Sequence, residues 1–287
     1  MITRRNFLKG SSFGAGILVL ENTFSQRRMI AKEHQASWEK ANLKLTIQTW
    51  SFRLFDIEEG LKKTHEAGVG FVEIAGGIKI KGQNKRAVAM TDEERKWFRS
   101  VAEENQVKAV SLGGNQGTRQ EFDFAAELGL AVMQGEPPFD RLVEVSGLAE
   151  EYQIHFALHN HATPNRYWNY KETLKRLDGC SPWLGFCPDT GHMMRSGIDP
   201  LTAVRDLKGR IFSIHLKDLN DTNRLDTEKK ELYDVPWGTG KGQVEAILHE
   251  LAAQKVRGPV IIEYEYKWED NVSEIAECVK FFNKVIG

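Results

Sequence analysis

One rhythm repeats along the chain from Leu43 to the C-terminus. A short apolar run is followed by polar or glycine-rich residues and then by a segment with helical periodicity, and this unit occurs eight times. Because parallel strands need a long crossover between them, the pattern predicts one (β/α)₈ TIM barrel over residues 43–287. The expected strands cover residues 44–52, 70–76, 107–113, 130–137, 154–161, 183–192, 210–218 and 258–265.

Metal-binding residue types stand near the ends of the last four expected strands. In barrels of this kind the C-terminal ends of the strands carry the chemistry. Each residue alone is equally well explained by an ion pair or a loop cap, but the four together predict a site for one divalent ion. Two imidazoles and two carboxylates suit Mn²⁺, Zn²⁺, Co²⁺, Fe²⁺ or Mg²⁺, with room for water or substrate oxygens. The four candidate ligands are His159, Asp189, His215 and Glu263.

The same strand ends supply further candidates. His161 follows His159 by two residues, so both side chains share a face if the strand continues. The candidates for proton transfer are Glu136, His161, Lys217 and Glu263, and those for substrate contact are Trp50, Glu73, His192 and Trp237. Structural alternatives stay open: His192 as a supporting residue, Lys217 as a solvated lysine at the rim, and the tryptophans as packing residues.

Five segments, in this order, resemble one superfamily: VEIAGG, LHNH, CPDTGHMMRSG, IHLKD and IIEYE. They are similar to the sugar phosphate isomerase/epimerase superfamily of xylose isomerase-like TIM barrels, over essentially residues 43–287. The segments Asp-Thr-Gly-His and His-Leu-Lys-Asp are the most specific. The resemblance implies one metal held at the ends of strands five to eight, again by His159, Asp189, His215 and Glu263.

Position 159 departs from the superfamily, whose epimerases carry a glutamate there. Two metal-bound glutamates serve such enzymes as a pair of proton-transfer groups on opposite faces of the substrate. A metal-bound imidazole has no free lone pair on the bound nitrogen, so His159 cannot do this. We therefore expect one base, Glu263, with Glu136, His161 or Lys217 as the acid, and isomerisation or elimination in preference to epimerisation.

The first 42 residues read as a signal and a linker. Thr3-Arg4-Arg5-Asn6-Phe7-Leu8-Lys9 resembles a twin-arginine export signal, and the apolar run at residues 11–20 is too short to span a bilayer. The resemblance implies a periplasmic or exported metalloprotein that meets the membrane only transiently, during export.

Charge narrows the choice of partner. With 39 Lys and Arg against 40 Asp and Glu, the net charge of −1 does not suit nucleic acid, and a small carbohydrate is the simpler partner. The chain is compatible with a homo-oligomer.

The leading hypothesis is a metal-dependent isomerase, epimerase or lyase that removes a proton next to a sugar carbonyl. Export argues against a phosphorylated substrate, so β-elimination from a 3-keto-glycoside by a lyase or hydrolase is an alternative. A non-catalytic sugar-binding barrel also fits the fold. An abasic-site endonuclease fits it less well, because it needs three metals and a basic groove.

Overall fold

The computed structural model describes residues 43–222 and 231–287. The expected signal and linker, residues 1–42, lie outside these ranges. Within them, no helix is both long enough and apolar enough to cross a membrane.

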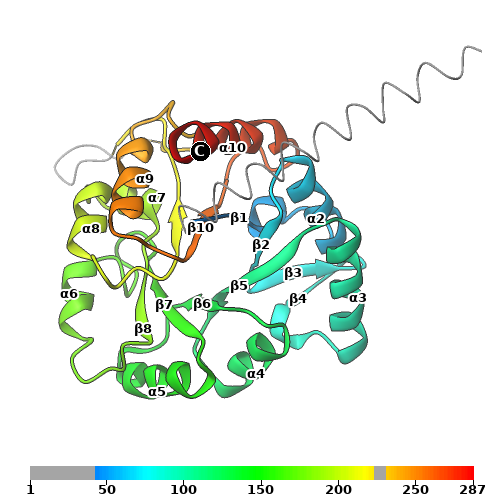
Figure 1. The fold of residues 1–287 in the computed structure, drawn as a ribbon, viewed down its shortest axis with the longest axis horizontal. Helices are drawn as coiled ribbons and strands as arrows, with labels where there is room; N and C mark the ends of the chain where they lie inside the picture. Colours follow the sequence, from blue (N-terminus) through cyan, green and yellow to red (C-terminus); the bar gives the residue numbers. More distant parts are fainter. Residues whose placement is uncertain (1–42, 223–230) are drawn as a thin grey trace, which may run out of the picture.

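Eight parallel strands form a nearly closed barrel, as predicted (Figure 1). Their order around the sheet is β8-β7-β6-β5-β2-β1-β10-β9. Two bridges, from Phe186 to Ile211 and from Asp189 to His215, join β8 to β9 and bring the ends of the sheet together. The strands are β1 (Lys44–Gln48), β2 (Phe71–Ile74), β5 (Lys108–Asn115), β6 (Val132–Gly135), β7 (His155–His159), β8 (Leu184–Cys187), β9 (Ile214–Leu216) and β10 (Pro259–Ile262).

Helices surround the barrel, and each strand-to-strand crossover in the described chain contains at least one. A capping box begins α3, because Thr91 and Glu94 each accept a hydrogen bond from the other's backbone N–H. The helices are α2 (Ile57–Glu66), α3 (Asp92–Glu104), α4 (Arg119–Glu127), α5 (Leu142–Tyr152), α6 (Tyr170–Lys175), α7 (Thr190–Arg195), α8 (Pro200–Asp206), α9 (Val244–Ala253) and α10 (Val272–Ile286), with short 3₁₀ helices η1 (Thr49–Phe52), η2 (Ala87–Ala89) and η3 (Phe139–Arg141).

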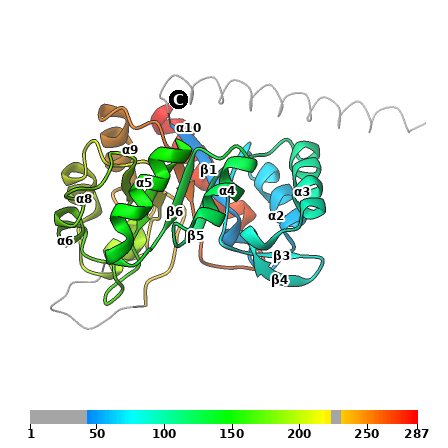
Figure 2. The same cartoon turned by 90° about the horizontal axis from the view of Figure 1, so that it is seen from below.

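An antiparallel hairpin, which the sequence analysis did not predict, stands between β2 and α3. It consists of β3 (Gly77–Ile80) and β4 (Gln83–Arg86). Its two-residue turn, Lys81-Gly82, has positive φ at both positions, as a tight hairpin turn requires. Figure 2 shows the hairpin beside α2 and α3, at the lower edge of the molecule.

The strands are shorter than expected, and this changes what carries the candidate ligands. β7 ends at His159, so His161 lies in the following loop. Asp189 and Glu263 lie beyond β8 and β10, and Asp189 is the N-cap of α7. His161, Asp189 and Glu263 therefore lie in the loops that follow the strands, and not in the strands themselves.

Candidate metal and substrate site

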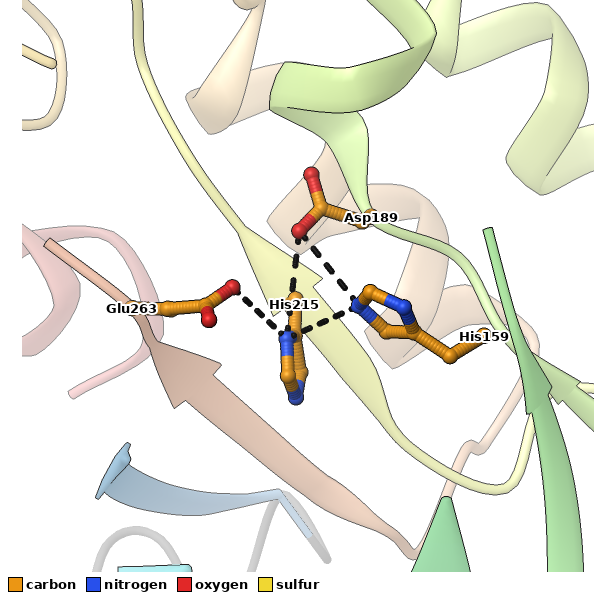
Figure 3. A group of neighbouring side chains, drawn as sticks. All are labelled: His159, Asp189, His215 and Glu263. Carbon is orange, nitrogen blue, oxygen red and sulfur yellow. Dashed lines mark hydrogen bonds and ion pairs between the residues drawn. The ribbon is translucent and has the colours of Figure 1, made fainter. Parts of the chain in front are cut away.

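The four predicted metal ligands converge in one buried cluster (Figure 3). One ligand atom from each of His159, Asp189, His215 and Glu263 lies within 4.8 Å of the others. His215 Nδ1 is 3.2 Å from His159 Nε2 and 3.0 Å from Glu263 Oε2. His159 Nε2 is 3.6 Å from Asp189 Oδ2. Four donors from four successive strand ends thus face a common point.

The two carboxylate oxygens of Asp189 have different surroundings. Oδ1 accepts the backbone N–H of His192 at 2.8 Å and caps α7. Oδ2 is buried and accepts no hydrogen bond from any described residue, although Lys217 Nζ lies 3.2 Å away. Lys217 balances part of the charge of this carboxylate but makes no hydrogen bond to Oδ2, which therefore keeps its lone pairs for a metal ion. The donor set therefore fits a divalent metal ion.

Glu73 fixes the orientation of the His215 ring. Its carboxylate is fully buried and accepts hydrogen bonds from Gln48 at 2.7 Å and Ser111 at 2.7 Å. His215 Nε2 lies 2.8 Å from Glu73 Oε1, and because a carboxylate only accepts, this nitrogen carries the hydrogen. Nδ1 is then free to bind a metal, the arrangement that supports many metal-bound histidines. Glu73 was predicted to contact substrate, but the structure places it behind the cluster, with its oxygens already occupied.

Glu136 lies on the other side of the cluster, between two histidines. Its Oε1 is 3.7 Å from His159 Nδ1 and makes a short contact with His161 Nδ1. Burial opposes ionisation, but hydrogen bonding to the two imidazoles lowers the pKa of Glu136 to about 2. An acid this strong is ionised at neutral pH and has no proton to give. The geometry thus makes Glu136 a partner of His159 and His161, in contrast to its predicted role as an acid.

Lys217 is buried against three carboxylates. Its Nζ lies 3.2 Å from Asp189 Oδ2, 2.9 Å from Glu263 Oε2 and 2.6 Å from Glu265 Oε2. Burial disfavours the ammonium, but these carboxylates outweigh it and hold the pKa of Lys217 well above its usual range. The alternative of a solvated rim lysine is wrong, because Lys217 is only 1% exposed.

His161 and His192 form a second layer of imidazoles beside the cluster. Their ring centroids are 4.7 Å apart, and the ring of His192 is 6.2 Å from that of His159. Burial lowers the pKa of His192 to about 3, so this ring is neutral at physiological pH. Its buried Nδ1 has no hydrogen-bond partner in the described chain. The structure thus brings His192, which was predicted to contact substrate, beside the cluster as a neutral ring.

The two predicted aromatic contacts differ in position. Trp50 is half-buried in η1, and its Nε1 donates to Glu265 Oε1 at 3.2 Å. The other oxygen of Glu265 pairs with Lys217. Trp237 is 3% exposed in the hydrophobic core, and its Nε1 donates to the carbonyl of Leu216 at 3.2 Å. The structure therefore brings Trp50 near the site and does not bring Trp237 there.

The buried position of Trp237 follows from a clamp on the segment that contains it. The carboxylate of Asp218 accepts the backbone N–H groups of Gly238 at 2.9 Å, Gly240 at 2.9 Å and Gly242 at 2.6 Å. A Cβ on Gly240 would lie 2.4 Å from Asp218 Oδ1, so only glycine fits. These hydrogen bonds tie the segment that contains Trp237 to Asp218, two residues after the end of β9.

The fold and this cluster define a (β/α)₈ barrel with a candidate metal centre at the C-terminal ends of its strands. The chain belongs to the xylose isomerase-like TIM barrel family, whose model matches residues 61–284. The resemblance noted in the sequence is confirmed at the level of this family. The match does not extend to the twin-arginine signal.

Three comparisons show how similar the chain is to known proteins. An inosose dehydratase of Bacillus cereus (strain AH820) is 28% identical over 137 residues, which are 44% of this chain and 45% of the relative. The chain thus matches somewhat less than half the length of this curated relative. The structure of an uncharacterised protein from Parabacteroides distasonis ATCC 8503 is 28% identical, with a TM-score of 0.65, and the match covers 85% of this chain and 99% of that chain. A xylose isomerase-like TIM barrel protein from Mycobacterium smegmatis in complex with magnesium is 13% identical, with a TM-score of 0.70, covering 85% of this chain and 96% of that one.

Proposed function

We propose that this chain is a divalent-metal-dependent enzyme that removes a proton next to the carbonyl of a sugar or keto-sugar. One observation carries the proposal: His159, Asp189, His215 and Glu263 converge from four strand ends, and a buried oxygen of Asp189 is left without a hydrogen bond. A bound divalent ion would polarise the substrate carbonyl and so acidify the neighbouring C–H bond. The buried, well-supported donors would keep such an ion in place.

Glu263 is the proposed base. Its Oε2 faces His215 and Lys217, which leaves Oε1 as the oxygen able to reach a substrate C–H bond. Lys217 lies beside it as an ammonium, so it is suited to balance the negative charge that develops on a substrate oxygen. His161, exposed in the loop after β7, is the candidate acid that remains closest to solvent.

The side chains at and around position 159 favour elimination or isomerisation over epimerisation. A two-base epimerase needs a second carboxylate facing the substrate, and His159 takes that place in the cluster. Glu136, the nearest other carboxylate, is paired with His159 and His161. The partial similarity to an inosose dehydratase supports elimination, since a dehydratase removes water. We propose a keto-sugar, free or as a 3-keto-glycoside, as the substrate class.

The test is proton exchange in D₂O. The metal-loaded protein is incubated with a panel of ketoses, aldoses and 3-keto-glycosides and followed by NMR. We expect deuterium in one C–H position of a substrate, with loss of a leaving group if the reaction is an elimination. Asp189→Ala should lose both metal, by elemental analysis, and exchange. Full metal content in this variant would refute the metal assignment, and sugar binding without exchange would favour a binding protein.

A further inference from the structure

A cavity of about 500 Å³ lies outside the metal cluster, and the residues that line it come from segments that follow β1 and β2. It is enclosed by η1, the start of α2 and the hairpin β3–β4. The hairpin is an addition to the eight strands of the barrel. Trp50, Arg53, Leu54, Asp56 and Lys79 are among the residues that line it. Its volume is within the range of sites that bind small molecules, about 300–1,000 Å³.

The cavity has an excess of positive charge. Among the described residues, neither Arg53 nor Lys79 has a carboxylate oxygen within ion-pair distance, and the Lys79 ammonium, which has three hydrogens, donates one to the carbonyl of Leu54 at 3.4 Å. By contrast, Lys85 pairs with Glu94 at 2.6 Å and Arg86 with Glu121 at 2.9 Å. The one acidic residue in the lining, Asp56, accepts the backbone N–H of Gly82 at the hairpin turn. Two cations in the lining are thus available to a ligand.

Flat apolar surface accompanies these cations. The guanidinium of Arg53 lies 4.9 Å from the ring centroid of Trp50 and 3.5 Å from that of Trp268, which holds it against the aromatic faces. Leu54 is 44% exposed in the same lining. An aromatic face beside a cation is suited to a sugar ring or an aromatic ring that carries an anionic group.

Trp50 connects this cavity to the cluster. Its ring lines the cavity, and its Nε1 donates to Glu265 Oε1. The other oxygen of Glu265 pairs with Lys217, which in turn lies 2.9 Å from Glu263. Trp50, Glu265 and Lys217 therefore form an unbroken series of contacts from the wall of the cavity to the proposed base.

We propose that the cavity is a second subsite, which binds a ring-sized group with a negative charge, such as a uronate, attached to the sugar that reacts at the cluster. The attachment rests on the proposed function, whereas the binding of an anionic ring rests on the cavity alone. The substrate class is then a glycoside with an acidic neighbouring group, larger than a free monosaccharide.

Binding of two matched probes tests the subsite. Calorimetry with 4-nitrophenyl β-D-glucuronide and 4-nitrophenyl β-D-glucoside compares ligands that differ in one carboxylate. We expect tighter binding of the glucuronide, and a loss of about two- to fivefold for each of the variants Arg53→Gln and Lys79→Met, with no change for the glucoside. Lys81→Met is the control, because Lys81 is an exposed residue at the turn of the same hairpin and does not line the cavity.

The variant Asp189→Ala separates this proposal from the metal hypothesis. If the probe binds in the cavity, this variant should retain glucuronide binding even if it loses metal and activity. Equal affinity for the two probes, unchanged binding by Arg53→Gln and Lys79→Met, or loss of binding in Asp189→Ala would each overturn the subsite.

Discussion

His159 and Glu263 face the Nδ1 atom of His215 from opposite sides in Figure 3, and they differ in what they can do for a substrate. A carboxylate that binds a cation through one oxygen keeps a second oxygen as a base. An imidazole that binds through one nitrogen keeps only an N–H group, which here lies on the side of Glu136. In the proposed function, this difference of one residue type leaves Glu263 as the one base on the cluster.

Glu263→Gln tests the proposed base. The amide has nearly the same shape and can still bind a metal through its oxygen, but it cannot accept a proton. We expect turnover and deuterium exchange to fall together by about 10²- to 10⁴-fold, measured by NMR on the metal-loaded variant. If the variant holds its metal and exchanges at the parent rate, Glu263 acts only as a ligand.

Glu73→Gln tests the support of His215. The amide can present an NH₂ group where His215 Nε2–H now donates, and this would favour the ring tautomer whose hydrogen is on Nδ1. We expect metal affinity to fall by about 10- to 100-fold, measured by competition with a chelator. The control is Glu121→Gln, because Glu121 is also buried but caps α4 away from the cluster. An unchanged metal affinity in Glu73→Gln would show that Glu73 serves packing alone.

At the scale of elements, His155 on β7 makes the stability of the folded chain depend on pH. Its ring lies 4.5 Å from that of Trp183 and 4.2 Å from that of Phe212, and burial lowers its pKa below the usual value. The unfolded chain, with the usual pKa of about 6.5, takes up a proton more readily than the folded chain. The contribution of His155 to stability is therefore complete above about pH 6.5 and is lost progressively as the pH falls below it.

His155→Phe removes this titration and keeps a flat ring between the two aromatic neighbours. We expect the difference in thermal stability between the variant and the parent to grow in favour of the variant from pH 7.5 to pH 5, measured by circular dichroism. Comparing the two proteins cancels the titration of the other histidines. A difference that stays constant over this range would show that the pKa of His155 is not lowered.

The elements differ in how far the sequence reveals them. The eight strands were predictable because each is an apolar run with a helix after it. The hairpin was not predicted, although Ile78 and Ile80 alternate with polar residues and Lys81-Gly82 is a tight-turn pair. Its strands are four residues each, and β4 has no buried residue, so the alternation is weak.

The four cluster residues could be predicted because strand ends share one face of the barrel. How deeply each side chain is buried could not be predicted from the sequence. Glu73 on β2 and Trp237 after β9 have the residue types of substrate contacts, but tertiary hydrogen bonds to His215 and Leu216 place them inside. In α2, helical spacing would place Ile57, Leu61 and His65 on one face, but His65 is exposed and Thr64 is buried beside Ile57 and Leu61. Such outcomes depend on neighbours that are distant in the chain.

At the scale of the whole molecule, we propose that residues 1–42 direct export. Replacing Arg4 and Arg5 with lysine keeps the charge and removes the motif, so we expect the precursor to remain in the cytoplasm, measured by fractionation and immunoblotting. The matched control replaces Arg27 and Arg28, a second arginine pair outside the motif, with lysine. Periplasmic protein at the parent level in the first variant would exclude this route.

The hairpin β3–β4 and the metal-site cluster are built from different parts of the chain. The cluster depends on β7 to β10 and the residues directly after them, where each side chain has several partners. The hairpin is an addition between β2 and α3. Within the described residues, it makes no hydrogen bond to the cluster. Changes in its length or charge would leave the four candidate metal ligands in place. Relatives could therefore acquire new substrates by exchanging this short segment while inheriting the same reaction centre.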